Sequence, residues 1–464
     1  MRSSRGREGP TPIERFVSVS ICLLLLGGCV SFDPKPLDSI PFKDRVQTQE
    51  KNGIRISTTV LSGEEARQAF GVDLESTNVQ AVWIRIENGT KVPFLFMAHG
   101  VDPNYFSALE VAYMHHSTLS FGRNERIDAY FRRLRFRELI QPNGSSEGFV
   151  FSNLTLGIKE VRIRLYGPAR SETVDFFVAV PGSQVDYRTV DWDKLDAQTV
   201  TDYDDELSFR DALRALPCCT TRSDGSGRGD SVNLILIGPR TVVGSALIRT
   251  GWDQTEVLTA ASAWRTIKAF FGGEYKNSPM SALYLFRRHQ DAGFQKARST
   301  IHQRNHLRLW LSPLRYRGQQ VWVGTITRDI GVYFTTRVWN LMTHAIDPTV
   351  DEARNYLHED LALGGSVERW GAVRGVGPAT PEAPHHNLMQ APWWTDGHRM
   401  VLAIPAEPVP LERQGFFYWD WPLAVGVDQD EFNRQLREMV EGRTGPNSAD
   451  NAEGPRRELI APLR

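Results

Sequence analysis

Residues 305–332, "NHLRLWLSPLRYRGQQVWVGTITRDIGV", decide the architecture of the second half of the chain. His306, Arg308 and Trp310 alternate with leucines, which is typical of a β-strand whose two faces meet different surroundings. A loop over 312–320, which contains a proline and a glycine, leads into a second run rich in β-branched residues. The stretch therefore predicts an antiparallel hairpin.

The register of this hairpin decides which side chains share a face. In one register, His306 and Arg308 lie beside Asp329, and a histidine, an arginine and a carboxylate together suit general acid/base chemistry or anion capture. A slip of one residue puts Arg328 on that face instead, and His306 becomes an ordinary sheet residue. The sequence leaves both registers open.

Residues 343–365, "THAIDPTVDEARNYLHEDLALGG", predict a helix that ends at the glycine pair. Asp347 precedes Pro348 and so has the position of a helix N-cap. His344 and Asp347 join the candidate catalytic residues, and His344, Asp347 and Asp351 form a set suited to a divalent metal ion. Capping and ion pairing explain the same residues without a metal, so both interpretations stay open.

The segment 186–230 is interpreted as a junction and contains an adjacent cysteine pair, Cys218 and Cys219. In an oxidising compartment these thiols can close a vicinal disulfide that is easily reduced and would act as a redox switch. The competing interpretation is a pair of small, buried and inert thiols. Residues 231–238, "SVNLILIG", follow as a buried strand, but the glycines after it lack the spacing and the lysine of a phosphate-binding loop.

Several motifs occur in an order that resembles a known family. They are "LPCCTTRSDGSGRGDSVNLILIG" (216–238), "SALYLFRRHQDAGFQKA" (281–297), "RNHLRLW" (304–310), "VWVGTITRDIGV" (321–332) and "THAIDPTVDEARNYLHEDL" (343–361). Together they resemble the C-terminal domain of the LssY family of bacterial envelope proteins. The resemblance covers about residues 207–370 and implies a mixed α/β domain, placed here over 231–430, whose biochemical role is itself unsettled.

LssY proteins often join this domain to membrane-embedded modules, one of which resembles a type 2 phosphatidic acid phosphatase. The signature of that module needs a Ser-Arg pair, a histidine and an aspartate at fixed spacing. Near His344, Thr336 and Pro348 occupy the serine and aspartate positions, and Arg337 lies one residue too far away. The phosphatase activity of that module is therefore not carried over to this chain from the resemblance.

Residues 49–185 predict a β-sandwich of immunoglobulin-like type, so the whole chain is expected to be α+β. The stretch "VQAVWIRIENGTKVPFLFMA" (79–98) has two apolar runs around Asn88-Gly89, which is a hairpin signal. Further short strands are predicted at "GFVFSNL" (148–154), "KEVRIRLYG" (159–167) and "VDFFVAVPG" (174–182). Such folds more often bind or act as spacers than catalyse.

Between these strands, residues 121–140, "FGRNERIDAYFRRLRFRELI", are basic and carry apolar residues at helical spacing. We expect a helix with a solvated charged face. The alternative is a face that contacts anionic lipid headgroups.

The chain begins with a basic segment that is followed by an apolar run over 17–26. At about 1.5 Å per residue such a run spans roughly half of a bilayer core, so it predicts a signal peptide over 1–28 and excludes a transmembrane helix. The motif "LGGC", Leu26–Cys29, resembles the bacterial lipobox, which implies a mature chain that starts at Cys29 with a diacylglycerol anchor on its thiol. Residues 29–48 then predict a polar tether.

At the other end, residues 431–464 predict an amphipathic helix followed by a disordered tail. The formal net charge of −1 provides no field that attracts nucleic acid, so no nucleic-acid partner is expected.

Two functions from different classes fit these features. The first is a lipid-anchored cell-envelope protein that binds or scaffolds, with the membrane as one partner and other envelope proteins or lipids as further partners. The second is a lipid-tethered hydrolase that acts on an envelope phosphate ester or glycolipid through the His/Asp/Arg candidates, with a divalent metal ion as the cofactor that the candidates suggest. Both face the periplasm, and Val30 after the cysteine favours the outer membrane over the inner one.

Overall fold

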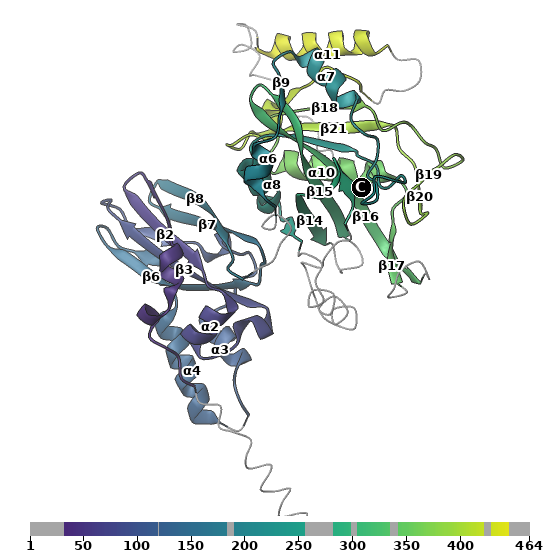
Figure 1. The fold of residues 1–464 in the computed structure, drawn as a ribbon. Coiled ribbons are helices and arrows are strands. Elements are labelled where there is room, and N and C mark those ends of the chain that lie inside the picture. The colour runs from purple at the N-terminus through teal and green to yellow at the C-terminus, as the bar shows by residue number, and fades with distance from the viewer. Residues whose placement is uncertain are drawn as a thin grey trace, which may run out of the picture. The chain divides into compact units, whose positions relative to one another are not determined.

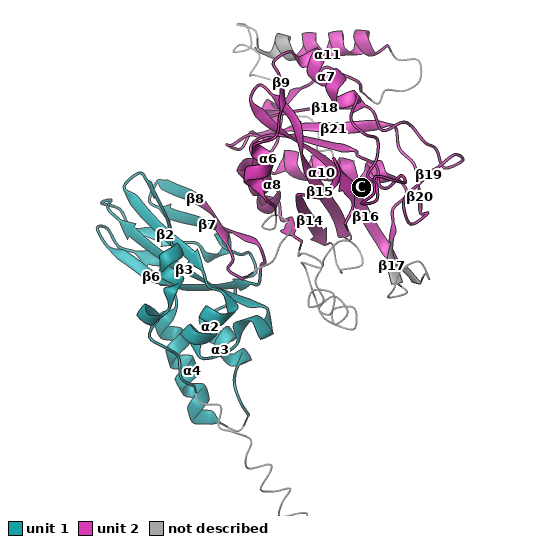
Figure 2. Cartoon of the chain, in the orientation of Figure 1, with its two compact units in different colours: residues 1–154, 161–174 teal, residues 155–160, 175–464 magenta. Residues whose placement is uncertain are grey.

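The computed structural model describes residues 32–118, 120–182, 190–255, 282–297, 304–334, 342–421 and 428–444. Helices and long runs of consecutive strands occur along the described part of the chain, which confirms the predicted α+β class (Figure 1). The chain divides into two compact units: unit 1 is 1–154 with 161–174, and unit 2 is 155–160 with 175–464 (Figure 2).

The predicted signal peptide over 1–28 and the predicted lipidation site Cys29 lie outside the described residues. Within the described ranges, no helix combines the length and the apolar character that a membrane crossing needs.

Two four-stranded sheets form the N-terminal part of the fold. The first has the order β1 (Gln47–Lys51), β2 (Ile54–Val60), β3 (Val79–Asn88), β6 (Ser145–Asn153), with antiparallel pairs throughout. The second has the order β5 (Leu139–Ile140), β4 (Phe94–Phe96), β7 (Ile158–Gly167), β8 (Arg170–Ala179). Short strands thus fill this region, whereas the immunoglobulin-like topology stays a prediction.

The predicted hairpin at Asn88-Gly89 is wrong, because β3 pairs with β2 and β6 while β4 belongs to the other sheet. The side-chain amide nitrogen of Asn88 donates to the carbonyl oxygens of Val92 and Gln141. Its side-chain oxygen accepts from the backbone N–H of Thr90. These bonds hold a turn that carries the chain from one sheet to the next.

Three helices join the first sheet: α2 (Gly63–Phe70), α3 (Ala108–Met114) and α4 (Phe121–Leu134). Their apolar side chains and those of the strands form one core. The ring centroids of Phe70 and Phe149 lie 5.0 Å apart, and those of Phe131 and Phe151 lie 5.4 Å apart. The basic stretch is therefore a helix, as expected, with Ile127 and Phe131 as its buried residues.

Residues 32–46 correct the predicted tether. This segment forms two 3-10 turns, η1 (Leu37–Ser39) and η2 (Pro41–Arg45). Ile40 is 3% exposed and Phe42 is fully buried, and both belong to the same core as α2 and α4. Ile40 and Phe42 are the physical reason, because burying their apolar side chains stabilises a packed segment over a solvated one.

A ten-stranded mixed sheet forms the centre of unit 2. Its main path is β11-β14-β15-β16-β10-β21-β18-β22, with β9 added to β15 and β17 added to β16. The bounds are β9 (Thr201–Tyr203), β10 (Leu234–Ile237), β11 (Asp253–Gln254), β14 (Ala292–Ala297), β15 (Arg304–Tyr316), β16 (Gln319–Phe334), β17 (Met342–Ile346), β18 (Arg369–Arg374), β21 (His398–Ala403) and β22 (Gly415–Phe416). Two small hairpins pair β12 (Tyr284–Leu285) with β13 (Arg288–His289), and β19 (His385–His386) with β20 (Pro392–Trp393).

The central strand β15 separates two cores. The helices of unit 2 are α6 (Trp192–Asp196), α7 (Glu206–Arg214), α8 (Arg240–Arg249), α10 (Val350–Leu363) and α11 (Gln429–Thr444), as far as the described ranges extend. Leu307 and Leu309 pack with Leu357 of α10 in one core. Trp310 packs with Phe209 of α7 in the other. The alternation along β15 therefore sorts its side chains between the two faces of the sheet.

The predicted junction over 186–230 is, where it is described, part of unit 2. Its strand β9 pairs with β15, and Phe209 of α7 is fully buried. The domain therefore begins before residue 231. The predicted terminal helix is α11, and residues 445–464 lie outside the described part of the chain.

The packing of residues 32–46 can be tested with Phe42→Ala. Removing this fully buried ring should lower the free energy of unfolding of unit 1 by about 3–5 kcal/mol, since truncation leaves a cavity in the core. Denaturant unfolding of the chain from Val30 onward, followed by tryptophan fluorescence, measures the change, because Phe42 contacts Trp83. The exposed neighbour Asp44 provides the control Asp44→Ala, and equal midpoints for the two variants would contradict the packing.

Candidate functional site

The hairpin of β15 and β16 has the register that brings the candidate residues to one face. His306 pairs with Thr327 and Arg308 pairs with Thr325, so Asp329 lies two residues along the same face as Thr327. The structure thus has the register in which His306, Arg308 and Asp329 share one face of the sheet. β14 continues this face, because Gln295 pairs with His306 from the other side.

A set of polar side chains, termed here the charged cluster, gathers on this face. Its members are the buried Gln295, Arg304, His306, Arg308 and Asp329 and the partly buried Asp230. The Oδ2 atom of Asp329 lies 3.1 Å from Nε2 of His306 and 3.6 Å from Nε of Arg304. Arg304 also donates from Nη1 to Oε1 of Gln295 over 2.7 Å. One carboxylate therefore faces both a histidine and a guanidinium.

Arg308 lies on the same strand but is close to a different carboxylate. Its Nη1 atom lies 3.9 Å from Oδ2 of Asp230, which precedes β10. Asp230 also accepts a hydrogen bond of 3.1 Å from the side chain of Asn387. Arg308 therefore shares the face of His306 and Asp329, but its guanidinium lies close to Asp230.

Burial controls the protonation of the charged cluster. The side chains of His306 and Asp329 are 9% and 3% exposed. Burial lowers the pKa of His306 to about 4, although the nearby Asp329 carboxylate acts in the opposite direction. His306 is therefore neutral at neutral pH. The two arginines then balance the two aspartates, which is the condition for keeping four charges in an interior.

This arrangement favours a structural or binding role over turnover. A general acid or base must reach the reacting group directly or through a water molecule, and its pKa works best near the operating pH. His306 is enclosed, and its pKa lies far below neutrality. What the charged cluster does provide is a fixed pattern of donors and acceptors across three strands.

The predicted N-cap of the helix over 343–365 is wrong by two residues. α10 begins at Val350, its N-cap is Thr349, and the Asp347 carboxylate accepts from the N–H of Thr349 over 3.0 Å. The residues after Asp347 explain the shift, since the carbonyl oxygen of Pro348 accepts from the N–H of Trp394 and the N–H of Val350 donates to the carbonyl oxygen of Trp394. The backbone is thus bonded to another segment where the sequence predicted the first turn of the helix.

Asp351, the third member of the predicted metal set, is occupied by protein partners. It accepts from the hydroxyl of Thr395 and from the N–H of Asp396, each over 2.7 Å. Its Oδ1 atom also lies 3.1 Å from Nη1 of Arg354. Arg354 is 3% exposed and makes a bidentate pair with Asp396. Burial raises the pKa of Asp396, but the hydrogen bonds from His398 and then from Arg354 hold it well below its usual range.

No three His, Cys, Asp or Glu side chains within the described ranges are placed to hold a metal ion. His344 lies on β17 opposite Val332, and its side chain is outside the described residues. The metal set of His344, Asp347 and Asp351 therefore stays a prediction. So does the catalytic role of His344 and Asp347.

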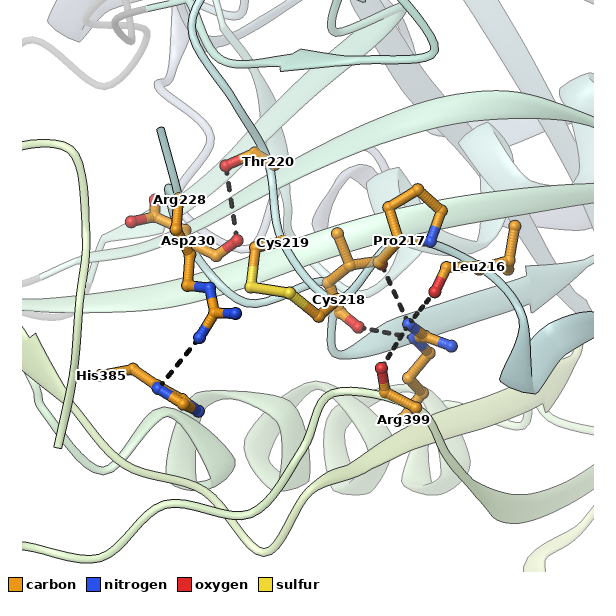
Figure 3. The surroundings of a disulfide bond; sticks show 11 residues. Leu216, Pro217, Cys218, Cys219, Thr220, Arg228, Asp230, His385 and Arg399 are labelled. Atoms are coloured by element: carbon orange, nitrogen blue, oxygen red, sulfur yellow. Dashed lines mark hydrogen bonds between the residues drawn. A yellow bond between two sulfur atoms is a disulfide. The ribbon is translucent and has the colours of Figure 1, made fainter. Parts of the chain in front are cut away.

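Cys218 and Cys219 are joined by a disulfide in the structure (Figure 3). Cys219 is 5% exposed and packs in a small apolar core with Val350 and Trp393. Thr220, the next residue, donates from its backbone N–H to the carbonyl oxygen of Asp230 over 3.0 Å. The disulfide segment is therefore linked through Asp230 to the charged cluster.

Arg399 fixes the chain just before the disulfide and was missed by the sequence analysis. Figure 3 shows its guanidinium among backbone carbonyls, and it donates to those of Leu216 and Pro217 over 2.8 and 2.9 Å. Its side chain is fully buried, and burial lowers its pKa to about 10. Nothing in the stretch around Arg399 distinguishes it from a surface arginine.

Arg304 was considered from the sequence only as a neighbour that the fold would have to bring close, although it carried a usable signal, because it precedes His306 by two positions and so shares its face. Asp230 and Gln295 carried none, because their proximity to β15 depends on the sheet order.

The buried neutral histidine predicts a pH dependence of stability. His306 has a pKa of about 4 in the folded chain, compared with 6.5 for an ordinary histidine, so between these values the unfolded chain binds more protons. Stability of unit 2 should therefore fall as the pH drops through this window, by about 2 kcal/mol at pH 5 from this residue. Denaturant midpoints at neutral and acidic pH measure the slope.

His306→Gln should reduce this slope by the part that His306 contributes, because glutamine has no proton to gain, and should leave the part that comes from His358, whose pKa burial also lowers to about 4. The exposed His386 in the same unit provides the control His386→Gln, which should keep the wild-type slope. A slope in His306→Gln as steep as in the wild type would contradict the burial of a neutral imidazole.

The comparisons with known proteins agree with the motif order. Residues 211–398 match the family described as LssY C-terminus, and this range contains the charged cluster and the disulfide. No curated protein matches the chain. The match covers less than half of the chain, and within it the resemblance inferred from the motifs is confirmed. The chain therefore contains a domain that resembles the LssY C-terminal family.

Proposed function

We propose that this protein is a lipid-anchored cell-envelope protein and that its LssY-like domain is a binding or scaffolding module. The observation that carries this proposal is the enclosure of the candidate acid/base pair, His306 and Asp329, which are 9% and 3% exposed and face each other. Buried side chains of this kind hold the strands together and keep the surface above them rigid. They are too enclosed to contact a substrate directly.

The N-terminal sequence supports the anchor. A basic segment, a short apolar run and the lipobox-like Leu26–Cys29 occur in the order of a lipoprotein signal. Phe32, three positions after Cys29, packs against Tyr130 with ring centroids 5.6 Å apart. A mature chain that starts at Cys29 would therefore keep every described residue.

The cysteine pair supports a location outside the cytoplasm. Disulfides persist in the periplasm and are rare in the reducing cytoplasm. A periplasmic chain with Val30 after the acylated cysteine fits the outer membrane better than the inner one. The partners that follow are the membrane and other components of the envelope, lipids or proteins.

The anchor is tested with Cys29→Ser in the full chain, expressed in a bacterium with two membranes. The wild type should incorporate labelled palmitate and sediment with membranes, whereas Cys29→Ser should lose the label because serine has no thiol to acylate. Cys22→Ser is the matched control, since Cys22 lies inside the predicted signal and should leave labelling unchanged. Labelling that persists in Cys29→Ser would refute the anchor.

An envelope hydrolase is the second candidate function. The distance of 3.1 Å between His306 Nε2 and Asp329 Oδ2, with Arg304 3.6 Å from the same carboxylate oxygen, is the observation that favours it. Its substrate would be a phosphate ester or a glycolipid with an anionic group, which the guanidinium groups would hold.

A phosphoesterase screen separates the two functions. The chain from Val30 onward is assayed with and without divalent metal ions, together with His306→Gln, His344→Ala and the control His358→Gln. His358 is another histidine whose pKa burial lowers to about 4, but it stacks on Trp370 away from the charged cluster. The binding proposal expects no turnover. If the wild type turns over a substrate, and this activity is lost in His306→Gln or His344→Ala but kept in folded His358→Gln, the binding proposal is wrong and the hydrolase is supported.

A further inference from the structure

We propose that the exposed face of α4 lies on the surface of an anionic lipid bilayer, beside the lipid anchor. This inference rests on the proposed anchoring at Cys29 for its geometry. The face itself consists of Phe121, Arg126, Arg132 and Arg133, all exposed, and is termed here the α4 face. Its partner is a membrane whose lipid headgroups carry negative charge.

The position of the N-terminal segment brings the anchor to α4. The ring of Phe32 packs edge-on against the ring of Tyr130 of α4, with centroids 5.6 Å apart. The backbone N–H of Lys35 donates to the carbonyl oxygen of Gln68 over 2.8 Å, which holds the segment in place. Phe32 follows Cys29 by three positions, and three extended residues span at most about 10 Å. An acyl chain on Cys29 therefore keeps α4 within that distance of the lipid.

The charge of the α4 face is complementary to anionic headgroups. Arg126, Tyr130 and Arg133 are spaced so that they share one side of the helix, the side that contacts Phe32. The guanidinium carbon of Arg133 lies 4.9 Å from the ring centroid of Tyr130. Arg126 and Arg133 therefore lie on the side of α4 that Phe32 contacts, three positions after the proposed anchor.

The acidic side chains of α4 do not cancel this charge. The helix contains four arginines and two acids, Glu125 and Asp128. Asp128 turns to His116, with Oδ1 2.8 Å from Nε2, and is only partly exposed. Glu125 is the acid that remains on the exposed side.

Exposed aromatic side chains border the α4 face. Phe121 at the start of α4 is 78% exposed, and Tyr113 at the end of the adjoining α3 is 74% exposed. Leu109, one turn before Tyr113 on α3, is 44% exposed. Aromatic rings prefer the interface between headgroups and acyl chains, and arginines beside them extend to the phosphates. This combination distinguishes a membrane-facing helix from a merely solvated one.

The test uses the chain from Val30 onward, which keeps every described residue and has no thiol at position 29. It is sedimented with vesicles of phosphatidylethanolamine and phosphatidylglycerol, and with vesicles of phosphatidylcholine alone. We expect binding to the anionic vesicles, a fall in binding as salt is raised, and little binding to the neutral vesicles.

Two charge-matched double variants locate the contact. Arg126→Gln with Arg133→Gln should weaken binding to anionic vesicles about thirtyfold, since each basic residue near such a surface contributes about a factor of five. The control is Arg434→Gln with Arg437→Gln on α11 of unit 2, which removes the same charge from another exposed helix and should change binding less than about twofold. Phe121→Ser should weaken binding about tenfold at low and high salt alike, because it removes apolar contact.

Each remaining outcome overturns the inference. Equal losses in the two double variants would mean that net charge alone drives binding. Equal binding to both kinds of vesicle would mean that the negative charge of the headgroups does not contribute. Self-association that disappears in the α4 double variant, without vesicle binding by the wild type, would assign the face to a second copy of the chain. Thermal melting of each variant excludes misfolding. A failure of acyl labelling at Cys29 refutes the anchor separately, because vesicle binding here does not need it.

Discussion

The pairing of β15 with β16 is the constraint on which the rest of unit 2 depends. Because His306 stands opposite Thr327, every second side chain of both strands is committed to one face of the sheet. Leu307 and Leu309 meet the helix α10, while Arg308 joins the charged cluster on the opposite face. A slip of one residue would move a guanidinium into the leucine core, where an unpaired charge costs several kcal/mol. Both faces therefore enforce the same register.

Unit 2 buries guanidinium groups repeatedly, and each is neutralised or bonded in a different way. Arg304 lies near Asp329, Arg354 pairs with Asp351 and Asp396, and Arg399 donates to backbone carbonyls. Such groups add little net stability when satisfied, but losing one partner leaves a costly charge in the interior. Their effect is to determine which strands and loops meet. A chain with this pattern tolerates few alternative packings of its central sheet.

The sequence predicted the local features well and the long-range ones poorly. Alternation in 306–311 located β15, and the motif order identified the LssY-like domain, because both depend on neighbours in the chain. The register was not readable, since both alternatives preserve the alternation. The helix start was misplaced because Pro348 and Val350 bond through their backbones to Trp394, a residue distant in sequence, instead of forming the first helical turn. Ion-pair partners such as Asp230 for Arg308 are distant in sequence, so only the sheet order reveals them.

The packed segment over 32–46 has a consequence for how the protein searches for partners. A flexible tether would let the folded part sample a volume of the periplasm, at an effective concentration that falls as the tether lengthens. Here Phe42 is fully buried and Phe32 packs against the same core, so this stretch is part of the fold of unit 1. Under the anchoring proposed at Cys29, unit 1 would explore a plane instead of a volume. Its encounters would then be concentrated on molecules that share the membrane, and distant components would have to come to it.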